Sequence, residues 1–170
     1  MNLRKVTTMT LALSAVLLSS CGKADQYSCG KAFGKTYRLD SVLYSFQKLD
    51  GSDSQFVPAS EYSGEAKAKM DEANAALDGL EISFVLEDKP KYKYNKGSTD
   101  LKELYFVEVP EIITGSSSKN KIKYTLPSFD INNGYLYFSE NCEEFTTTEN
   151  NAFKVGEVKY SALYSYKVVK

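Results

Sequence analysis

Carboxylates are the groups of this chain best suited to acid–base chemistry, because none of its 170 residues is a histidine. Without imidazole there is no Ser-His-Asp triad, no histidine metal site and no imidazole general base. Two carboxylates could still hydrolyse a glycosidic bond, and the candidates, which the sequence does not pair, are Glu61, Glu65, Asp71, Glu72, Glu81, Glu143 and Glu144. Most carboxylates are solvated surface groups. We therefore expect no enzyme, no cofactor and no metal ion.

A stretch of alternating lysine and tyrosine is a candidate recognition site. Residues 89–96 place lysines around Tyr92 and Tyr94, and an aromatic ring beside a positive charge could stack on sugars or bases, or lie on anionic lipid headgroups. The same alternation is typical of a half-buried strand with inward tyrosines and with lysines that deter pairing at its edge. We favour the strand.

The first twenty residues have the three parts of a secretory signal. Arg4 and Lys5 form a basic start, residues 6–18 form an apolar run, and small residues precede Cys21. The apolar run is shorter than the roughly 20 residues that a membrane-spanning helix needs. Leu18-Ser19-Ser20-Cys21 resembles the lipobox of bacterial lipoproteins.

This resemblance implies cleavage before Cys21, with lipid on its sulfur and an acyl chain on its new amine. Several acyl chains, at roughly 0.8 kcal/mol per buried methylene, make a stable membrane anchor. An ordinary signal peptide with an accidental cysteine is the alternative. The expected location is the cell envelope, and Gly22 after the lipidated cysteine resembles the pattern sent to the outer membrane if the host is Gram-negative.

The other two cysteines can then form one disulfide. If Cys21 carries lipid, Cys29 and Cys142 remain as a possible pair in an oxidising compartment. Such a bond closes a loop of more than a hundred residues, for which the loop-entropy model gives an upper figure of about 4–5 kcal/mol. Two free thiols are the alternative.

The composition of the mature chain fits one small β domain. Tyrosine is abundant, with 13 residues, and glycine and proline are sparse and fall mostly between apolar stretches, which favours strands. Removing Arg4 and Lys5 leaves 19 basic against 22 acidic residues, a charge of about −3. This balance indicates no nucleic-acid partner. We expect a signal peptide at 1–20, a lipidated tether at 21–33 and one monomeric domain at 34–170.

Eight strands are predicted from alternation and turn residues. They lie at 35–48, 80–86, 91–95, 101–109, 122–126, 129–131, 135–138 and 154–169. Asn132-Asn133-Gly134 is a hairpin signal, because Asn-Gly tolerates positive φ. The polar residues 140–151 are interpreted as a connection.

The first of these strands changes phase part-way. Tyr37 and Leu39 share one face, whereas Val42 and Tyr44 share the next. One extra residue near Asp40 must absorb the shift, which predicts a β-bulge. A strand of this length should also bend within a curved sheet.

One helix is predicted between the first and second strands. Ser63 is its N-cap and Gly79 stands at its end, and its narrow stripe consists of Ala66, Met70, Ala73 and Leu77. Such a stripe suits a helix on the outside or across the end of a sheet. A mobile lid over a ligand cavity is the alternative.

The expected fold is mostly β: a small antiparallel up-and-down β-barrel of about eight strands, with one α-helix between the first and second strands. Pairing the first strand with the last would remove exposed edges. The pattern from Gly34 to Val169 resembles the lipocalin-like, calycin-type lipoproteins of bacteria. Lipocalins usually open with Gly-x-Trp, whereas Gly34-Lys35-Thr36-Tyr37 places tyrosine one residue later.

Two functions follow from this fold, because eight strands enclose either a filled core or room for one small ligand. The first is a membrane-anchored binding module for a small apolar or amphipathic ligand, in a cavity lined by Tyr37, Leu39, Phe84, Tyr124, Phe138 and Tyr164. The second is a structural or interaction lipoprotein with a filled barrel, which binds an envelope or host protein through its loops.

Overall fold

The computed structural model describes residues 24, 27–111, 121–129 and 134–169, with the backbone alone at 108–111 and 121–126. The proposed lipidation site Cys21 and the hairpin signal at Asn132-Asn133 lie outside the described residues. In the described part of the chain, no helix has the length and apolarity to span a membrane.

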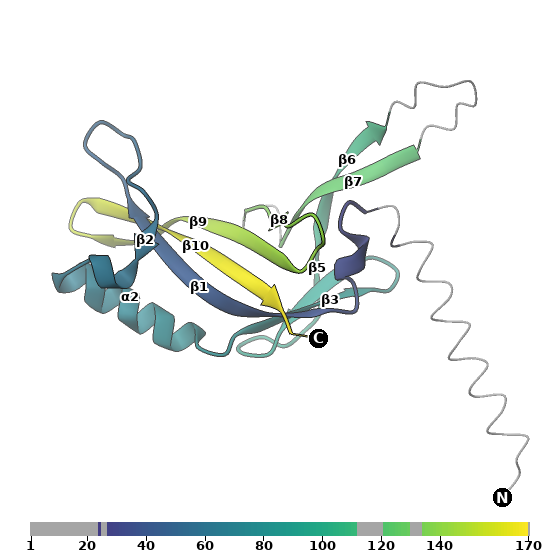
Figure 1. The fold of residues 1–170 in the computed structure, drawn as a ribbon, viewed down its shortest axis with the longest axis horizontal. Helices are drawn as coiled ribbons and strands as arrows, with labels where there is room; N and C mark the ends of the chain where they lie inside the picture. The colour runs from purple at the N-terminus through teal and green to yellow at the C-terminus, as the bar shows by residue number, and fades with distance from the viewer. Residues whose placement is uncertain (1–23, 25–26, 112–120, 130–133, 170) are drawn as a thin grey trace, which may run out of the picture.

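Antiparallel strands form one curled, eight-stranded sheet with the spatial order β5-β4-β3-β1-β10-β9-β8 and with β2 beside β1, which together make a half-barrel (Figure 1). Its strands are β1 (Thr36–Phe46), β2 (Val57–Pro58), β3 (Glu81–Leu86), β4 (Pro90–Tyr94), β5 (Lys102–Glu103), β8 (Tyr137–Phe138), β9 (Glu144–Val155) and β10 (Val158–Val168). The predicted fold class is confirmed: the protein is mostly β and antiparallel, and its first strand pairs with its last.

A second sheet of two strands projects from the half-barrel (Figure 1). It consists of β6 (Tyr105–Glu111) and β7 (Lys121–Ser128). The predicted single strand at 101–109 is therefore wrong, because the chain divides at the buried Leu104, with β5 on β4 and β6 on β7. The residues before Leu104 thus belong to the half-barrel, and those after it belong to the two-stranded sheet.

The predicted β-bulge in β1 is confirmed. Pairing with β10 shifts register between Leu39 and Ser41. On either side of the shift, Tyr37 and Tyr44 are 0% and 2% exposed. Tyr164 packs against the clusters that contain both tyrosines. The extra residue therefore keeps Tyr37 and Tyr44 on the same face of β1, each in a buried cluster that Tyr164 contacts.

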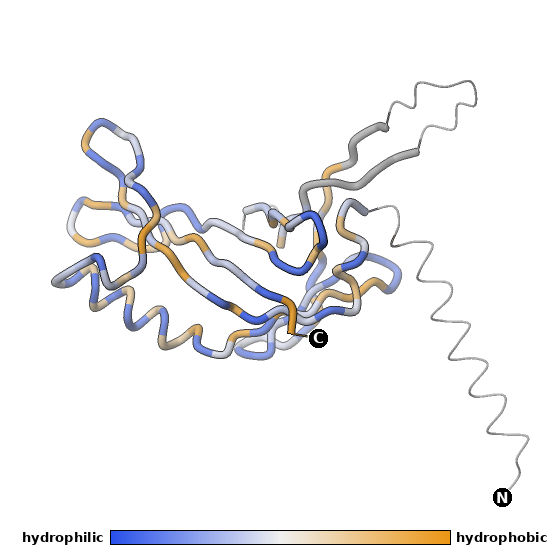
Figure 2. The backbone as a smooth tube through the Cα atoms, in the orientation of Figure 1, coloured by the Kyte–Doolittle hydropathy of each residue, from blue (hydrophilic) through white to orange (hydrophobic). Residues whose placement is uncertain are grey.

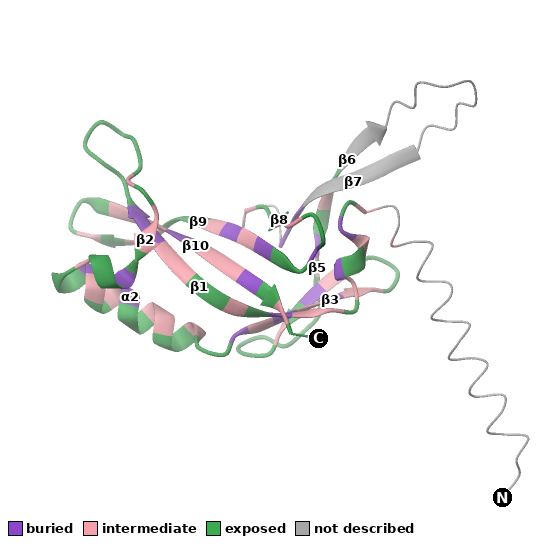
Figure 3. Ribbon diagram, viewed as in Figure 1, coloured by how far each residue is buried: buried purple, intermediate pink, exposed green. Residues whose placement is uncertain are grey.

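The predicted helix is α2 (Gly64–Leu77), preceded by the short 3₁₀ turn η2 (Ala59–Glu61). Ser63 has an extended backbone at the N-cap, and Gly79 follows the helix with a φ of +65°. The buried residues of α2 are Ala66 and Met70 (Figure 3). The Tyr44 hydroxyl donates a hydrogen bond of 2.8 Å to Asn74 Oδ1. The buried Ala66 and Met70 and the Tyr44 hydroxyl thus hold α2 against β1.

The predicted polar connection at 140–151 is wrong, because most of it belongs to β9. This strand forms a hairpin with β10 around Gly156, which has a φ of +56°. Phe145 and Thr147 are 1% and 5% exposed. Alternate positions thus point into the core. The strand is rich in β-branched threonine, but its many polar residues mask the hydrophobic alternation that predicts a strand. Figure 2 shows this mixture of polar and apolar residues along the strands.

A disulfide joins Cys29, just before the 3₁₀ turn η1 (Gly30–Ala32), to Cys142 in the turn between β8 and β9. The two Cα atoms lie 6.0 Å apart. The Tyr37 hydroxyl donates a hydrogen bond of 2.5 Å to the Cys142 main-chain oxygen. The pair expected from cysteine parity is therefore at bonding distance, and it connects the start of the domain to its last hairpin.

Candidate functional site

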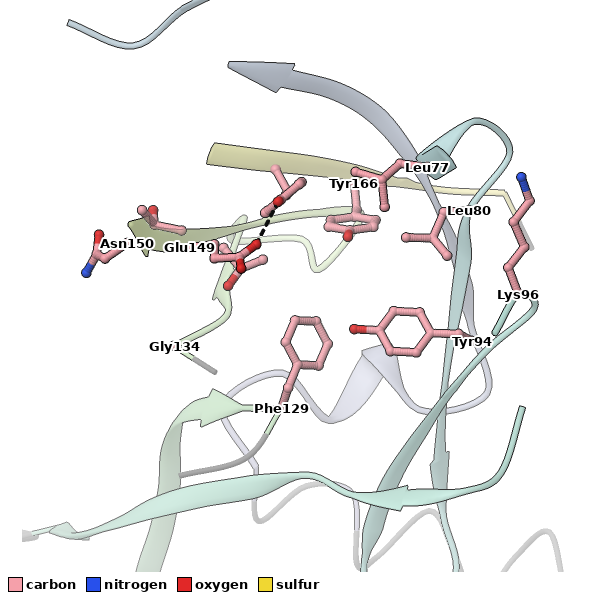
Figure 4. A pocket seen from close by; sticks show the side chains of 12 residues that line it. Leu77, Leu80, Tyr94, Lys96, Phe129, Gly134, Glu149, Asn150 and Tyr166 are labelled. Carbon is pink, nitrogen blue, oxygen red and sulfur yellow. Dashed lines mark hydrogen bonds between the residues drawn. The ribbon is translucent and has the colours of Figure 1, made fainter. Parts of the chain in front are cut away.

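A pocket of about 630 Å³ lies in the hollow of the half-barrel. Its wall joins Tyr94 of β4 to residues of β9 and β10, which lie on the other side of β1 in the sheet. Because the sheet is curled, these two arms face each other across the pocket (Figure 4). The end of α2 and the segments at Phe129 and Gly134 complete the wall.

One end of the pocket is apolar. Leu77 from the last turn of α2, Leu80 and Tyr166 lie together, and Tyr94 and Phe129 face them (Figure 4). Leu80, Phe129 and Tyr166 are 8%, 5% and 4% exposed. Tyr166 is held in place by a stacked ring, because its centroid lies 4.5 Å from that of Phe145. This end offers rigid aromatic and aliphatic surface.

The other end of the pocket is polar and is built by β9. Thr147, Thr148, Glu149 and Asn150 border it in sequence. Glu149 and Asn150 lie at the end farthest from Lys96 (Figure 4). Both are exposed, so this end opens to solvent. The pocket can therefore hold a molecule with an apolar body and a polar end.

Glu149 supplies negative charge at the polar end. Its Oε2 atom accepts a hydrogen bond of 2.8 Å from the Tyr164 hydroxyl. Burial raises the pKa of Tyr164 well above its usual value, and Glu149 raises it further. Burial, Tyr94 and Glu149 raise the pKa of Tyr166 in the same way. Tyrosine is already neutral at neutral pH, and these shifts of the pKa keep Tyr164 and Tyr166 neutral hydroxyls at alkaline pH as well.

Thr147 places an unused polar atom in the pocket wall. Its Oγ1 atom is buried and has no hydrogen-bond partner among the described residues. Leaving a buried hydroxyl unpaired costs about 1–3 kcal/mol. Ser45 Oγ is in the same state, but Ser45 does not border the pocket. The Thr147 hydroxyl is thus covered by its neighbours, although the residue borders the pocket.

Lys96 borders the opposite, apolar end. Its Nζ atom donates a hydrogen bond to the main-chain oxygen of Asp78, the residue that follows α2. A cation is stabilised at a helix C-terminus, where the helix dipole is negative. The Lys96 charge is thus held at the helix end, and its aliphatic stem faces the pocket (Figure 4).

The residues predicted to line a cavity divide between the pocket and the packed core. Tyr164 borders the pocket. The side chain of Tyr124 lies outside the described residues. The other four pack in the aromatic core instead of the wall of this pocket, and they are Tyr37, Leu39, Phe84 and Phe138.

These four residues do not border the pocket because large neighbouring rings fill the space around them. The Tyr37 ring centroid lies 5.5 Å from that of Phe84, 6.0 Å from that of Phe138 and 5.3 Å from that of Phe145. Such edge-to-face contacts fill one end of the half-barrel. The space remains farther along β9, where threonine replaces phenylalanine on the inward face.

Sequence reasoning missed most of the pocket wall because it treated β9 as a connection. The alternation Phe145-x-Thr147-x-Glu149 was the available signal, since threonine and phenylalanine favour strands. Phe129 and Leu80 carry no comparable signal. Their place in the wall depends on contacts between distant parts of the chain.

The lysine–tyrosine stretch is a half-buried strand, as predicted. Tyr92 is 3% exposed, and Tyr94 is half-buried. Lys89 Nζ lies 2.8 Å from Glu103 Oε1, and Lys91 Nζ lies 2.8 Å from Glu87 Oε2. Lys89 and Lys91 therefore pair with surface carboxylates, and the tyrosines face inward.

The candidate catalytic carboxylates do not border the pocket. Arg38 pairs with Glu81 at 2.6 Å, and Lys67 pairs with Asp71 at 2.5 Å. Within the described residues, no three acidic, cysteine or histidine side chains are grouped to hold a metal ion. A scan of protein-family models and searches of curated proteins and of solved structures found no match to this chain.

Proposed function

We propose that the protein is a lipid-anchored, extracytoplasmic binding module whose half-barrel holds one small apolar or amphipathic molecule. The main support for a ligand is the pocket of about 630 Å³. Its volume lies within the range of about 300–1,000 Å³ typical of small-molecule sites. Its apolar end can bury a hydrocarbon, and the exposed Glu149 can contact a polar group.

The sequence and the disulfide support the anchor and the location. Leu18-Ser19-Ser20-Cys21 resembles a lipobox, and the pattern of the domain resembles the lipocalin-like lipoproteins. Disulfides persist in oxidising compartments outside the cytoplasm, and Cys29 bonds to Cys142. These features favour the cell envelope, with the outer membrane as the site in a Gram-negative host.

The disulfide would also make the tether short. Cys29 is joined to Cys142 in the half-barrel and follows Cys21 by eight residues. At no more than about 3.6 Å per residue, these span at most about 29 Å. An acylated Cys21 would therefore keep the pocket close to the bilayer, in which amphipathic molecules concentrate.

Titration of the domain with 1-octanol, followed by NMR amide shifts, tests the ligand proposal. Burying an octyl chain at roughly 0.8 kcal/mol per methylene supplies several kcal/mol, so we expect a Kd of about 1 mM or tighter. The shifts should concentrate on β9, β10 and the end of α2. Thr147→Phe places a ring in the pocket and should weaken binding at least about tenfold.

Thr146→Phe is the matched control, because Thr146 is the neighbouring residue of β9 and does not border the pocket. It should bind 1-octanol as the wild type does. Leu77→Ala removes apolar surface from the other end of the pocket, so it tests the site even if Thr147→Phe does not fold. It should weaken binding several-fold. Shifts spread over other surfaces, or equal binding by Thr147→Phe and Thr146→Phe when both are folded, would contradict the proposal.

The interaction lipoprotein is the second candidate, and the projecting sheet of β6 and β7 favours it (Figure 1). Tyr105 and Val107 on β6 are each 42% exposed, and Tyr137 on β8 is 57% exposed. Exposed apolar residues that lie together can form a protein-binding surface. Absence of octanol binding by the folded wild type would make this candidate the better one.

A further inference from the structure

We propose that the ligand of the pocket is a cationic amphiphile, with an ammonium head at Glu149 and an aliphatic tail at Leu77 and Leu80. This inference rests on the proposed function and specifies its ligand class. It depends on how charge, aromatic rings and hydrogen-bond acceptors are distributed along the pocket (Figure 4).

The two charged residues in the wall act differently. Glu149 is exposed at the polar end, and one of its oxygens accepts a hydrogen bond from Tyr164. A carboxylate has room for several donors on its two oxygens, so Glu149 can also bind an ammonium group. Lys96 already donates to the Asp78 main-chain oxygen at the end of α2. The negative charge therefore lies at the solvent-open end of the pocket, and the positive charge lies at the opposite end, beside the end of α2.

Aromatic rings extend this preference into the pocket. Tyr94, Phe129, Tyr164 and Tyr166 all border it. The face of an aromatic ring is electrostatically negative and attracts ammonium groups. Tyr164 is half-buried and Tyr166 is buried, and burial and Glu149 raise the pKa of both, so neither adds a negative charge of its own. Among the described residues that border the pocket, a cation that enters beyond Glu149 thus meets aromatic rings before it reaches Lys96.

The hydrogen-bonding groups at the polar end of the pocket also favour an ammonium head. An ammonium head carries donors and no acceptor. The Glu149 carboxylate, exposed at the solvent-open end and with one oxygen bonded to Tyr164, offers acceptors for such a head. A carboxylate or sulfate head would meet the charge of Glu149 at this end. At the other end, such a head at Lys96 would direct its tail toward the solvent-open end at Glu149 and away from Leu77 and Leu80 (Figure 4).

The tail has a matching environment. Leu77 and Leu80 lie at the end of the pocket away from Glu149, with Tyr94 and Phe129 opposite them (Figure 4). A straight alkyl chain that starts at Glu149 would run along Tyr166 toward these leucines. The ligand is thus oriented by its charge and retained by burial of its hydrocarbon.

The test compares octylammonium, 1-octanol and octanoate in the same NMR titration, because the three share one tail. Octylammonium should bind about tenfold tighter than 1-octanol at low salt, and octanoate should bind least. In Glu149→Gln, whose amide oxygen can still accept from Tyr164, the ratio of octylammonium to octanol affinity should fall close to one. Salt should lower the wild-type ratio, because Glu149 is exposed.

Glu144→Gln is the matched control, since Glu144 is an exposed carboxylate on β9 that does not border the pocket. It should keep the wild-type ratio. The inference is wrong if octanoate or 1-octanol binds as tightly as octylammonium, or if Glu149→Gln leaves the ratio unchanged. If none of the three probes binds the folded protein, the proposed function fails instead.

Discussion

Replacing both Cys29 and Cys142 by alanine should lower the free energy of unfolding by about 2–5 kcal/mol. The bond closes a loop with a sequence separation of 113 residues, so its loss frees a large part of the unfolded chain. It also frees the segment before β1 from the turn at Cys142. Domains of this kind are stable by about 5–15 kcal/mol in total, so the loss is a large share. Urea denaturation followed by circular dichroism measures it.

Reduction of the wild type provides the control for this prediction. Dithiothreitol should lower the wild-type midpoint to that of the double variant, and it should not change the double variant. The hydrogen bond from the Tyr37 hydroxyl to the main-chain oxygen of residue 142 does not need the cysteine side chain, so the variant should still fold. A double variant as stable as the oxidised wild type would show that the bond contributes nothing to stability.

Phe145→Ala should cost about 3–5 kcal/mol, the usual range for a large buried ring. Phe145 is 1% exposed. Its ring stacks on Tyr166 at 4.5 Å and lies 5.3 Å from Tyr37 and 5.5 Å from Phe84. Its removal leaves a cavity at the centre of the aromatic core, and the neighbouring rings are too rigid to fill it.

Phe46→Ala is the matched control, because Phe46 is on the same sheet and is 36% exposed. It should cost well under half as much in the same urea experiment. Phe145→Ala should also weaken octanol binding, because Phe145 supports Tyr166 in the pocket wall. Equal losses of stability at the two positions would contradict the assignment of Phe145 to the centre of the core.

The features that sequence predicted well depend on local periodicity or on simple counting. The phase change between Leu39 and Val42 located the bulge, because side chains alternate strictly along a strand. Ser63 and Gly79 located the ends of α2, because caps need particular backbone conformations. The disulfide followed from parity once one cysteine was assigned to lipid.

The pocket could not be predicted to the same degree, because its wall comes from opposite arms of the sheet. Tyr94 and Tyr166 face each other through the curl of the half-barrel, which depends on contacts between distant residues. β9 was missed because its inward Thr147 and Glu149 are as polar as its outward residues. A strand with polar residues on its inner face lacks the hydrophobic alternation by which strands are predicted.

Native mass spectrometry of the full chain, extracted from the membranes of its own host in mild detergent, most directly tests the proposal of a lipid-anchored binding module. From this proposal we expect a monomer with acyl chains on Cys21 and with one small molecule that leaves on denaturation. The same preparation of Thr147→Phe should carry the acyl chains without the small molecule. An unacylated chain, a wild type with no bound molecule, or a molecule that Thr147→Phe retains would contradict it.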